Sequence, residues 1–253
     1  MSKGFSHICR KVVAVGRNYV EHARELGSQI ESDPVIFLKP PSAIIEQGEK
    51  IVLPEGITDL HHEVELGLVI GKELSKAKLS DSVDANRPNN SAVNLGHNTL
   101  GTHAHNVPFF RDSLLGFVVA MDMTNRALQN QLKSRQLPWT LSKSFDTSCP
   151  VGPLLPCAML PPKLFVSDYE EFRKNASTVE LWLRVNGTDH QRATIDGMIH
   201  SPAKLISFIS HHMRLEPGDL ILTGTPAGVG PVKSGDVITA GIKGLCEVEF
   251  RVV

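Results

Sequence analysis

Two glutamates, Glu63 and Glu65, stand two residues apart within residues 61–70, a stretch that is otherwise rich in apolar residues. In a β-strand, side chains alternate between two faces, so both carboxylates would point from the same face. Removing an unpaired carboxylate from water is expensive, and a buried pair is usually neutralised by cationic side chains, by a shared proton or by a metal ion. We favour a metal ion, which needs a third oxygen ligand from elsewhere in the chain.

Asp122 is the candidate for this third ligand. It follows the continuous apolar run of residues 116–121, which suits a buried strand, and it precedes a segment that Thr124 could cap as a helix. Arg126 and Gln129 fall three residues apart on that helix, so both can face back toward Asp122. The alternative is that Asp122 belongs only to the helix cap, and without the two glutamates this interpretation would be preferred.

A candidate for proton transfer lies in residues 18–26, which have helical composition and contain His22 and Glu25. Residues three apart on a helix are neighbours on one face, so the carboxylate could orient the imidazole and stabilise its charge. From the spacing alone, a surface ion pair is the favoured interpretation. Lys143 is a further candidate, although a lone lysine among serines and threonines is usually solvated.

Residues 222–231 contain three glycines and two prolines. They predict a rigid loop whose backbone N–H groups can approach an anion closely, and a purely structural turn is equally consistent with them. The segment lacks the Lys-Ser/Thr pair of a P-loop and the glycine spacing of a dinucleotide-binding fingerprint, so it is not a nucleotide motif.

The segment between Ser75 and Asp112 shows neither helical nor strand periodicity, which predicts a long loop. It carries His97, His103 and His105. Imidazoles on an unpatterned polar loop are more often solvated than bound to metal, and we prefer that interpretation.

The remaining elements are mostly strands. Strand candidates lie at residues 12–15, 35–38, 51–53 and 246–253, while residues 179–185 alternate and lead through Asn186-Gly187, a strong type I′ hairpin signal, to a return strand. Ser201-Pro202 begins an amphipathic helix, and residues 161–175 read as a polar connection. Because strands and helices do not alternate regularly, we predict a β-rich α+β fold around antiparallel or mixed sheets. No linker divides two cores, so one domain is expected over residues 1–253.

The composition is that of an ordinary globular protein, with 253 residues, 41% hydrophobic residues and 21% charged residues. The 26 basic and 27 acidic residues leave a net charge of −1, which provides no electrostatic footprint for nucleic acid or an anionic membrane. Partners are expected to be small molecules or a second copy of the chain.

No segment is long and apolar enough to span a bilayer, and the N-terminus lacks a secretory signal, so we predict an intracellular protein, cytoplasmic or mitochondrial. The four cysteines have no Cys-x-x-Cys spacing and are expected to be reduced core thiols.

Five motifs occur in order along the chain: Gly16-Arg17-Asn18-Tyr19 with His22 and Glu25, His62-Glu63-Val64-Glu65-Leu66-Gly67, Met121-Asp122-Met123-Thr124 with Arg126 and Gln129, Trp139-Thr140-Leu141-Ser142-Lys143-Ser144, and Leu222-Thr223-Gly224-Thr225-Pro226-Ala227-Gly228-Val229-Gly230. Together they resemble the motifs of the fumarylacetoacetate hydrolase family. The resemblance is closest to its short acylpyruvase and oxaloacetate decarboxylase type, the fumarylacetoacetate hydrolase domain-containing protein 1 group, and it runs from about Val12 to Val253.

The resemblance implies a mixed β-sandwich roll with a few peripheral helices, usually dimeric, so we expect a homodimer. The loop at about residues 84–115 is longer than short members of the family usually carry. The implied site residues are a metal set of Glu63, Glu65 and Asp122 that holds Mg²⁺ or Mn²⁺, a catalytic set of His22, Glu25 and Lys143, and substrate contacts from Arg17, Arg126, Gln129, Gly224 and Thr225. Three carboxylates suit a hard divalent cation better than zinc, so ligand chemistry agrees with this implication.

The function expected from this resemblance is Mg²⁺-dependent cleavage of a C–C bond in small 2-oxo acids, by acylpyruvate hydrolysis, oxaloacetate decarboxylation or both, through a metal-stabilised pyruvate enolate. A second enzymatic possibility is isomerisation or decarboxylation of 2-hydroxy-dienedioate intermediates, as in the 2-hydroxyhepta-2,4-diene-1,7-dioate type. A third possibility, from a different class, is a non-catalytic metal-binding protein. The His22 and Glu25 pair and Lys143 count against the third, because a purely structural carboxylate site needs neither.

Overall fold

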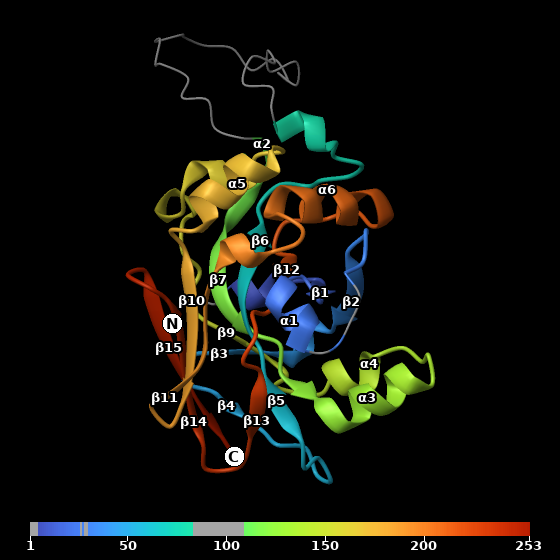
Figure 1. Ribbon diagram of the computed structural model, residues 1–253, viewed down its shortest axis with the longest axis vertical. Coiled ribbons are helices and arrows are strands. Elements are labelled where there is room, and N and C mark those ends of the chain that lie inside the picture. The colour runs from blue at the N-terminus through green and yellow to red at the C-terminus, as the bar shows by residue number, and fades with distance from the viewer. Residues whose placement is uncertain (1–4, 26, 28–29, 83–108) are drawn as a thin grey trace.

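The structure is a computed structural model that describes residues 5–25, 27, 30–82 and 109–253 (Figure 1). Its largest sheet has seven strands in the order β2-β1-β12-β6-β7-β9-β3. Their bounds are β1 (Val12–Gly16), β2 (Val35–Lys39), β3 (Ile44–Glu46), β6 (Val64–Ile70), β7 (Leu114–Met121), β9 (Cys149–Val151) and β12 (Leu220–Leu222). Strands β1 and β12 pair in parallel, as do β3 and β9, whereas β6 is antiparallel to both of its neighbours.

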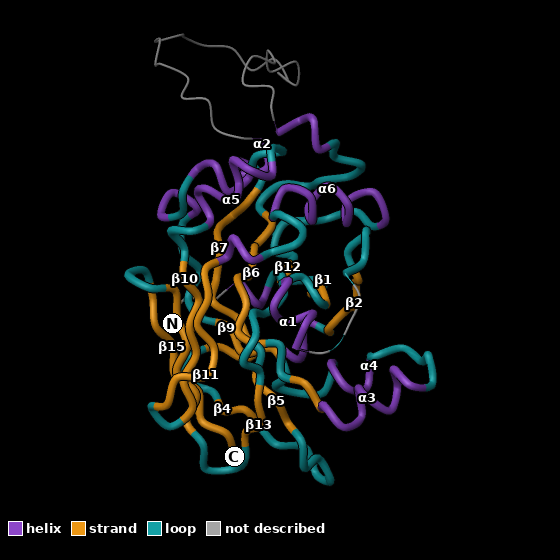
Figure 2. The backbone as a smooth tube through the Cα atoms, viewed as in Figure 1, coloured by secondary structure: helices purple, strands orange, loops and turns teal. Residues whose placement is uncertain are grey.

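The described residues form two smaller sheets as well. One has five strands in the order β11-β10-β14-β15-β4, and the other has three in the order β13-β5-β8. Their bounds are β4 (Lys50–Ile51), β5 (Leu60–His62), β8 (Thr124–Asn125), β10 (Glu180–Val185), β11 (Thr188–Thr194), β13 (Gly230–Val232), β14 (Val237–Ile242) and β15 (Cys246–Val252). The predicted β-rich fold of mixed sheets with few helices is confirmed (Figure 2).

In the view of Figure 1, α5 and α6 lie near the top of the sheets, α3 and α4 lie together at the lower right, and α1 lies near the middle. The α-helices are α1 (Val20–Glu25), α2 (Phe109–Asp112), α3 (Arg126–Ser134), α4 (Thr140–Lys143), α5 (Tyr169–Ala176) and α6 (Pro202–His212). Short 3₁₀ helices span Phe5–His7, Pro41–Ala43, Leu79–Ser82, Cys157–Met159, Pro162–Phe165 and Ile195–Gly197.

Strand β6 is the central element of the core, and all seven of its residues are buried. Leu66 and Leu68 on one face belong to a cluster with Leu181 and Phe250 of the five-stranded sheet. On the opposite face, Val69 packs in a second cluster that contains Val118 of β7. Burial of both faces explains why this stretch reads as a nearly continuous apolar run, and it places Glu65 in a water-poor environment.

Several predicted elements are confirmed by the structure. Asn186 and Gly187 both have positive φ, 51° and 81°, as a type I′ turn between β10 and β11 requires. Ser201 caps α6, and its side-chain oxygen accepts a hydrogen bond from the Lys204 N–H.

Two local predictions are wrong. The cap of α3 is Asn125, whose side chain accepts a hydrogen bond from the Leu128 N–H, while the Thr124 hydroxyl donates to the Asp122 carbonyl. The segment read as a polar connection contains α5, capped by Asp168. Helix α5 was missed because it contributes few apolar residues to the core, namely Phe172 and Ala176.

The predicted loop insertion ends in regular structure, because α2 and the start of β7 occupy its last residues. Residues 83–108, with His97, His103 and His105, lie outside the described residues. Within the described part of the chain, no helix is long and apolar enough to cross a membrane. The four cysteines are free thiols, three of them buried, and burial raises the pKa of Cys149 to about 12.

Candidate metal centre and active site

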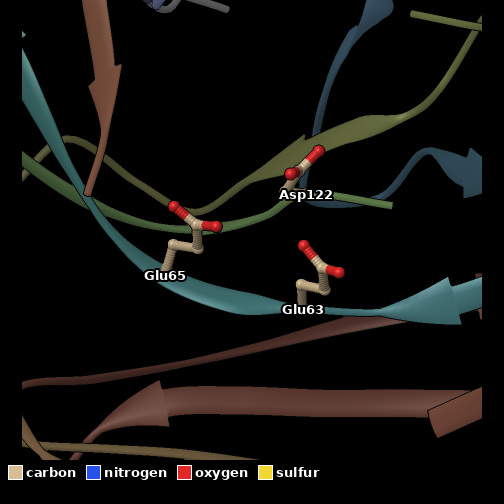
Figure 3. Close-up of side chains that lie close together, drawn as sticks. All are labelled: Glu63, Glu65 and Asp122. Atoms are coloured by element: carbon tan, nitrogen blue, oxygen red, sulfur yellow. The ribbon is translucent and has the colours of Figure 1, made fainter. Parts of the chain in front are cut away.

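Three carboxylates converge where β5, β6 and β7 meet. Glu63 lies between β5 and β6, Glu65 lies on β6, and Asp122 directly follows β7. Because Val64 pairs with Met121 and the Asp122 N–H donates to the Glu63 carbonyl at 2.9 Å, the end of β7 is held beside the two glutamates. All three are buried, and one carboxylate oxygen from each lies within 4.8 Å of the others (Figure 3).

Cationic side chains surround two of these carboxylates. The Lys143 ammonium donates to Glu63 Oε2 at 2.8 Å and to Asp122 Oδ2 at 2.5 Å. Lys39 donates to Asp122 Oδ1 at 2.7 Å, and Arg126 forms an ion pair with the other oxygen of Glu63. Lys143 is therefore buried and paired, unlike the usual lone lysine among serines and threonines.

These contacts set the protonation of the paired groups. Burial alone would raise the pKa of Glu63, but Lys143 and Arg126 outweigh it and hold that pKa well below its usual range. Burial likewise opposes the charge of Lys143, but Asp122 and Glu63 raise its pKa above the ordinary value. Glu63 and Lys143 are therefore both charged at neutral pH.

Glu65 differs from the other two carboxylates. Its Oε2 accepts a hydrogen bond from the Gly224 N–H at 2.6 Å, and within the described part of the chain no lysine or arginine forms an ion pair with it. Burial, followed by the charges of Asp122 and Glu63, raises the pKa of Glu65 well above its usual range. A hard divalent cation prefers such oxygen ligands and would stabilise the ionised form of Glu65. The three carboxylates therefore fit Mg²⁺ or Mn²⁺.

His22 and Glu25 form a second candidate group of the site. His22 Nδ1 lies 2.9 Å from Glu25 Oε2, and the other oxygen of Glu25 accepts a hydrogen bond from the Gly228 N–H at 3.2 Å. Although Glu25 is exposed, His22 is only 3% exposed, so the pair is not a surface ion pair. A carboxylate at Nδ1 orients the ring and leaves Nε2 as the nitrogen available for proton transfer.

One pocket joins the carboxylates to His22. Nine of the eleven residues predicted for the site line this pocket. The other two contact lining residues: Glu25 contacts His22, and the Gly224 N–H donates to Glu65. The lining residues are Val15, Gly16, Arg17, His22, Phe37, Glu63, Glu65, Asp122, Arg126, Gln129, Lys133, Trp139, Lys143 and Thr225. The structure thus brings the predicted metal, catalytic and substrate-contact residues into one place.

The glycine-rich loop contacts carboxylates of the protein itself. Gly224 has φ of +95°, and a Cβ there would meet the Asn18 Cβ at 2.7 Å, so only glycine fits. Its N–H points at Glu65, and the Gly228 N–H points at Glu25. The loop therefore positions one predicted ligand and one member of the predicted dyad, rather than presenting these two N–H groups to a substrate.

Several residues of the site were missed at the level of sequence. Phe37, Lys133 and Trp139 lay in predicted segments but were given no role. Lys39 directly followed a predicted strand, and Gln191 directly preceded the return strand predicted near residues 192–195. None has a local signal, because an isolated lysine or glutamine in a strand or helix is ordinary until packing buries it.

Gln191 uses all of its side-chain hydrogen-bonding groups to tie β6 to the glycine-rich loop. Its Oε1 accepts from the Val64 N–H and lies 3.0 Å from His62 Nδ1, while its Nε2 donates to Thr225 Oγ1 at 2.8 Å and to the Pro226 carbonyl at 2.9 Å. The residue is fully buried. Gln191 therefore holds Thr225 in place beside the strand that carries Glu65.

We expect Gln191→Leu to lower the free energy of unfolding by about 2–4 kcal/mol, because it leaves the Val64 N–H and the Pro226 carbonyl buried without partners. Chemical denaturation measures this loss. Arg192→Leu, which removes exposed ion pairs from the same strand, is the matched control and should cost less than about 1 kcal/mol. A Gln191→Leu protein as stable as this control would contradict the role of Gln191.

Comparison with known proteins identifies the family of this chain. Residues 11–85 and 95–253 match the family model described as fumarylacetoacetate (FAA) hydrolase C-terminal. The chain belongs to the fumarylacetoacetate hydrolase family. Members at this level of similarity include a protein of Arabidopsis thaliana named oxaloacetate tautomerase FAHD1, mitochondrial, 42% identical over 96% of this chain and 90% of its own length. A Dictyostelium discoideum protein named oxaloacetate decarboxylase, mitochondrial, is 40% identical over 96% of this chain and 94% of its own length.

A solved structure extends the likeness to the fold. Fumarylpyruvate hydrolase from Pseudomonas aeruginosa, in complex with Mn²⁺ and pyruvate, superposes with a TM-score of 0.75 at 32% identity, covering 97% of this chain and 90% of its own. The predicted family membership is confirmed, and the chain is an enzyme of this family.

Proposed function

We propose that this enzyme acts on small 2-oxo acids through a pyruvate-type enolate, catalysing oxaloacetate decarboxylation or tautomerisation and acylpyruvate hydrolysis. The observation that carries the proposal is the pocket in which three buried carboxylates, the Lys143 ammonium and the His22 imidazole come together. The names of the relatives point to the same substrates, since they act on oxaloacetate or fumarylpyruvate.

The proposed cofactor is Mg²⁺ or Mn²⁺, held by Glu63, Glu65 and Asp122. When bound, the cation supplies positive charge for the carboxylate and keto oxygens of the substrate and for the enolate. The raised pKa of Glu65 supports this assignment, because Glu65 is the carboxylate that lacks a cationic side-chain partner in the described part of the chain. The structure of the Pseudomonas relative, which contains Mn²⁺ and pyruvate, also supports the assignment of a divalent cation.

Polar side chains of the pocket would orient the substrate. The three N–H groups of Lys143 donate to Glu63, Asp122 and Thr124, so the ammonium would stabilise negative charge on a substrate oxygen through its charge. Arg126 donates to Gln129 Oε1 at 2.6 Å, which fixes both groups on one wall for a carboxylate or oxo group. Thr225, held by Gln191 and donating to the Val64 carbonyl, lines the pocket as well.

His22 would move the proton. With Glu25 at Nδ1, Nε2 can accept a proton from a water that attacks the distal carbonyl of an acylpyruvate, or from C3 of oxaloacetate during tautomerisation. Decarboxylation needs no such base, because the electrons of the C3–C4 bond remain in the enolate when CO₂ leaves.

Two alternatives use the same pocket differently. An isomerase of 2-hydroxy-dienedioates would use His22 to move a proton between carbons. A non-catalytic metal-binding protein would have no use for a buried imidazole oriented by a carboxylate beside a buried lysine, so the geometry disfavours it. Both relatives are named as mitochondrial proteins, which accords with the intracellular location that the sequence predicts, and the homodimer stays a prediction.

A substrate panel tests the proposal. We expect oxaloacetate and acetylpyruvate to be turned over with Mg²⁺ or Mn²⁺, and the activity to stop in EDTA and return when metal is restored. Turnover of a 2-hydroxy-dienedioate alone would establish the isomerase instead. No turnover of any substrate, in protein shown to be folded by circular dichroism, would support the non-catalytic alternative.

A further inference from the structure

The outer wall of the pocket carries two cations on one aromatic ring. Arg17 Cζ lies 5.7 Å from the centroid of the Trp139 ring, and Lys133 Nζ lies 5.3 Å from it. All three side chains line the pocket and are half-buried, in contrast to the fully buried carboxylates and Lys143. The pocket therefore has a buried floor for the metal and a partly solvated cationic rim.

The rim cations are poorly neutralised. Lys143, Lys39 and Arg126 each form an ion pair with a floor carboxylate. In the part of the chain that the structure describes, Lys133 has no carboxylate within ion-pair distance. Among the described residues, Arg17 has one carboxylate within ion-pair distance, Glu31 at 3.9 Å, and its Nε is buried with no hydrogen-bond partner.

Neighbouring charge adds to this imbalance. Burial, followed by the charges of Arg126 and Arg17, lowers the pKa of Lys133 to about 8, against a weaker opposing effect of Glu63. At pH 7 the ammonium is still mostly protonated. An anion bound at the rim would relieve repulsion among these cations and desolvate little new charge on the protein, whereas an uncharged group would not.

We propose that Lys133, with Arg17 near the same Trp139 ring, binds the distal carboxylate of a dicarboxylic 2-oxo acid, and so makes this pocket selective for oxaloacetate-type substrates over acylpyruvates with uncharged tails. The inference rests on the proposed function, because it takes the 2-oxo acid end of the substrate to lie on the floor at Glu63, Glu65 and Asp122. Lys133 is then a specificity-determining residue that touches the substrate.

The ion pair between Lys133 and the distal carboxylate also affects which reaction oxaloacetate undergoes. In tautomerisation a proton leaves C3, its electron pair forms the C2–C3 double bond of the enolate, and a proton returns to oxygen. In decarboxylation the C3–C4 bond breaks, its electron pair forms the same double bond, and the C4 carboxylate leaves as neutral CO₂. An ammonium paired with the C4 carboxylate stabilises the charged group relative to CO₂, so Lys133 favours proton transfer over decarboxylation.

The test compares Lys133→Met on oxaloacetate and on acetylpyruvate with saturating Mg²⁺. We expect the KM for oxaloacetate to rise about tenfold or more, as for loss of a charged hydrogen bond, while kcat/KM for acetylpyruvate falls less than threefold. We also expect decarboxylation to make up a larger share of oxaloacetate turnover, measured as pyruvate formed against enol formed. Lys133→Arg should restore most of the oxaloacetate affinity.

Arg135→Met is the matched control, because Arg135 is an exposed cation that directly follows the same helix and does not line the pocket. It should leave both substrates unaffected. Equal losses on both substrates in Lys133→Met, no change on either, or a smaller share of decarboxylation would overturn the inference. If the unaltered enzyme turns over neither substrate, the proposed function itself fails, which is a distinguishable result.

Discussion

Glu63→Gln is expected to abolish metal binding and to reduce both acylpyruvate hydrolysis and oxaloacetate decarboxylation by about 10³-fold or more, because both reactions would depend on the same charge stabilisation. Glu63 is one of three converging carboxylates, and it also orients Lys143 and Arg126. The amide preserves the shape of the side chain while removing its charge. Titration with Mn²⁺ by calorimetry measures binding, and steady-state assays with Mg²⁺ measure both reactions.

Stability must be followed in the same variant. Three carboxylates and three cations, Lys39, Arg126 and Lys143, are buried together, and removing one carboxylate charge leaves positive charge uncompensated. Some loss of stability is therefore expected, and a melting curve shows whether the variant is folded at the assay temperature. Glu249→Gln, an exposed carboxylate on β15, is the control. A folded Glu63→Gln enzyme that still turned over in chelator would rule out the metal site.

His22→Ala is expected to separate the two activities. Acylpyruvate hydrolysis should fall by about 10²- to 10⁴-fold, the usual loss when a general base is removed, whereas oxaloacetate decarboxylation should fall about tenfold at most. The reason is that water attack needs a proton acceptor and loss of CO₂ does not. Steady-state kinetics on both substrates with the same enzyme preparation measure the difference.

A substitution of Glu25, the partner of His22, should cause a smaller loss of the same kind. Glu25→Gln keeps a hydrogen-bonding group near His22 Nδ1 but removes the charge that stabilises the imidazolium, so it should show the same pattern with a smaller loss. His212→Ala removes an exposed imidazole from α6, does not touch the pocket and should behave as the unaltered enzyme. Equal losses of hydrolysis and decarboxylation in His22→Ala would refute the division of roles.

Much of the candidate site could be predicted from local spacing and from the order of the motifs. The two-residue spacing of Glu63 and Glu65 predicts a shared face, and the structure shows them side by side opposite Asp122 (Figure 3). The three-residue spacing of His22 and Glu25 predicts their contact. The same kind of information predicted the Asn186-Gly187 hairpin and the cap of α6.

Local sequence patterns did not predict the correct cap of α3, where two neighbouring residues can both cap a helix. They also did not predict α5, because most of its residues are polar. Thr124 and Asn125 are both good helix caps, and both pair with β5. The Thr124 hydroxyl donates to the Asp122 carbonyl, and the Asn125 side chain caps α3. Helix α5 is short and mostly polar, so its buried Phe172 and Ala176 produce too weak a pattern to distinguish it from a loop.

The sequence by itself determined what each segment prefers: the extended segment that carries Glu63 and Glu65, the turn that pairs β10 with β11, and the family to which the chain belongs. Only the tertiary structure decided which charged side chains are neutralised by ion pairs and which remain available to bind a ligand. Three contacts between different segments show this: Lys39 with Asp122, Gln191 with Thr225, and Lys133 with Trp139. Side-chain periodicity and turn chemistry are local properties, whereas burial and charge pairing depend on which distant strands become neighbours.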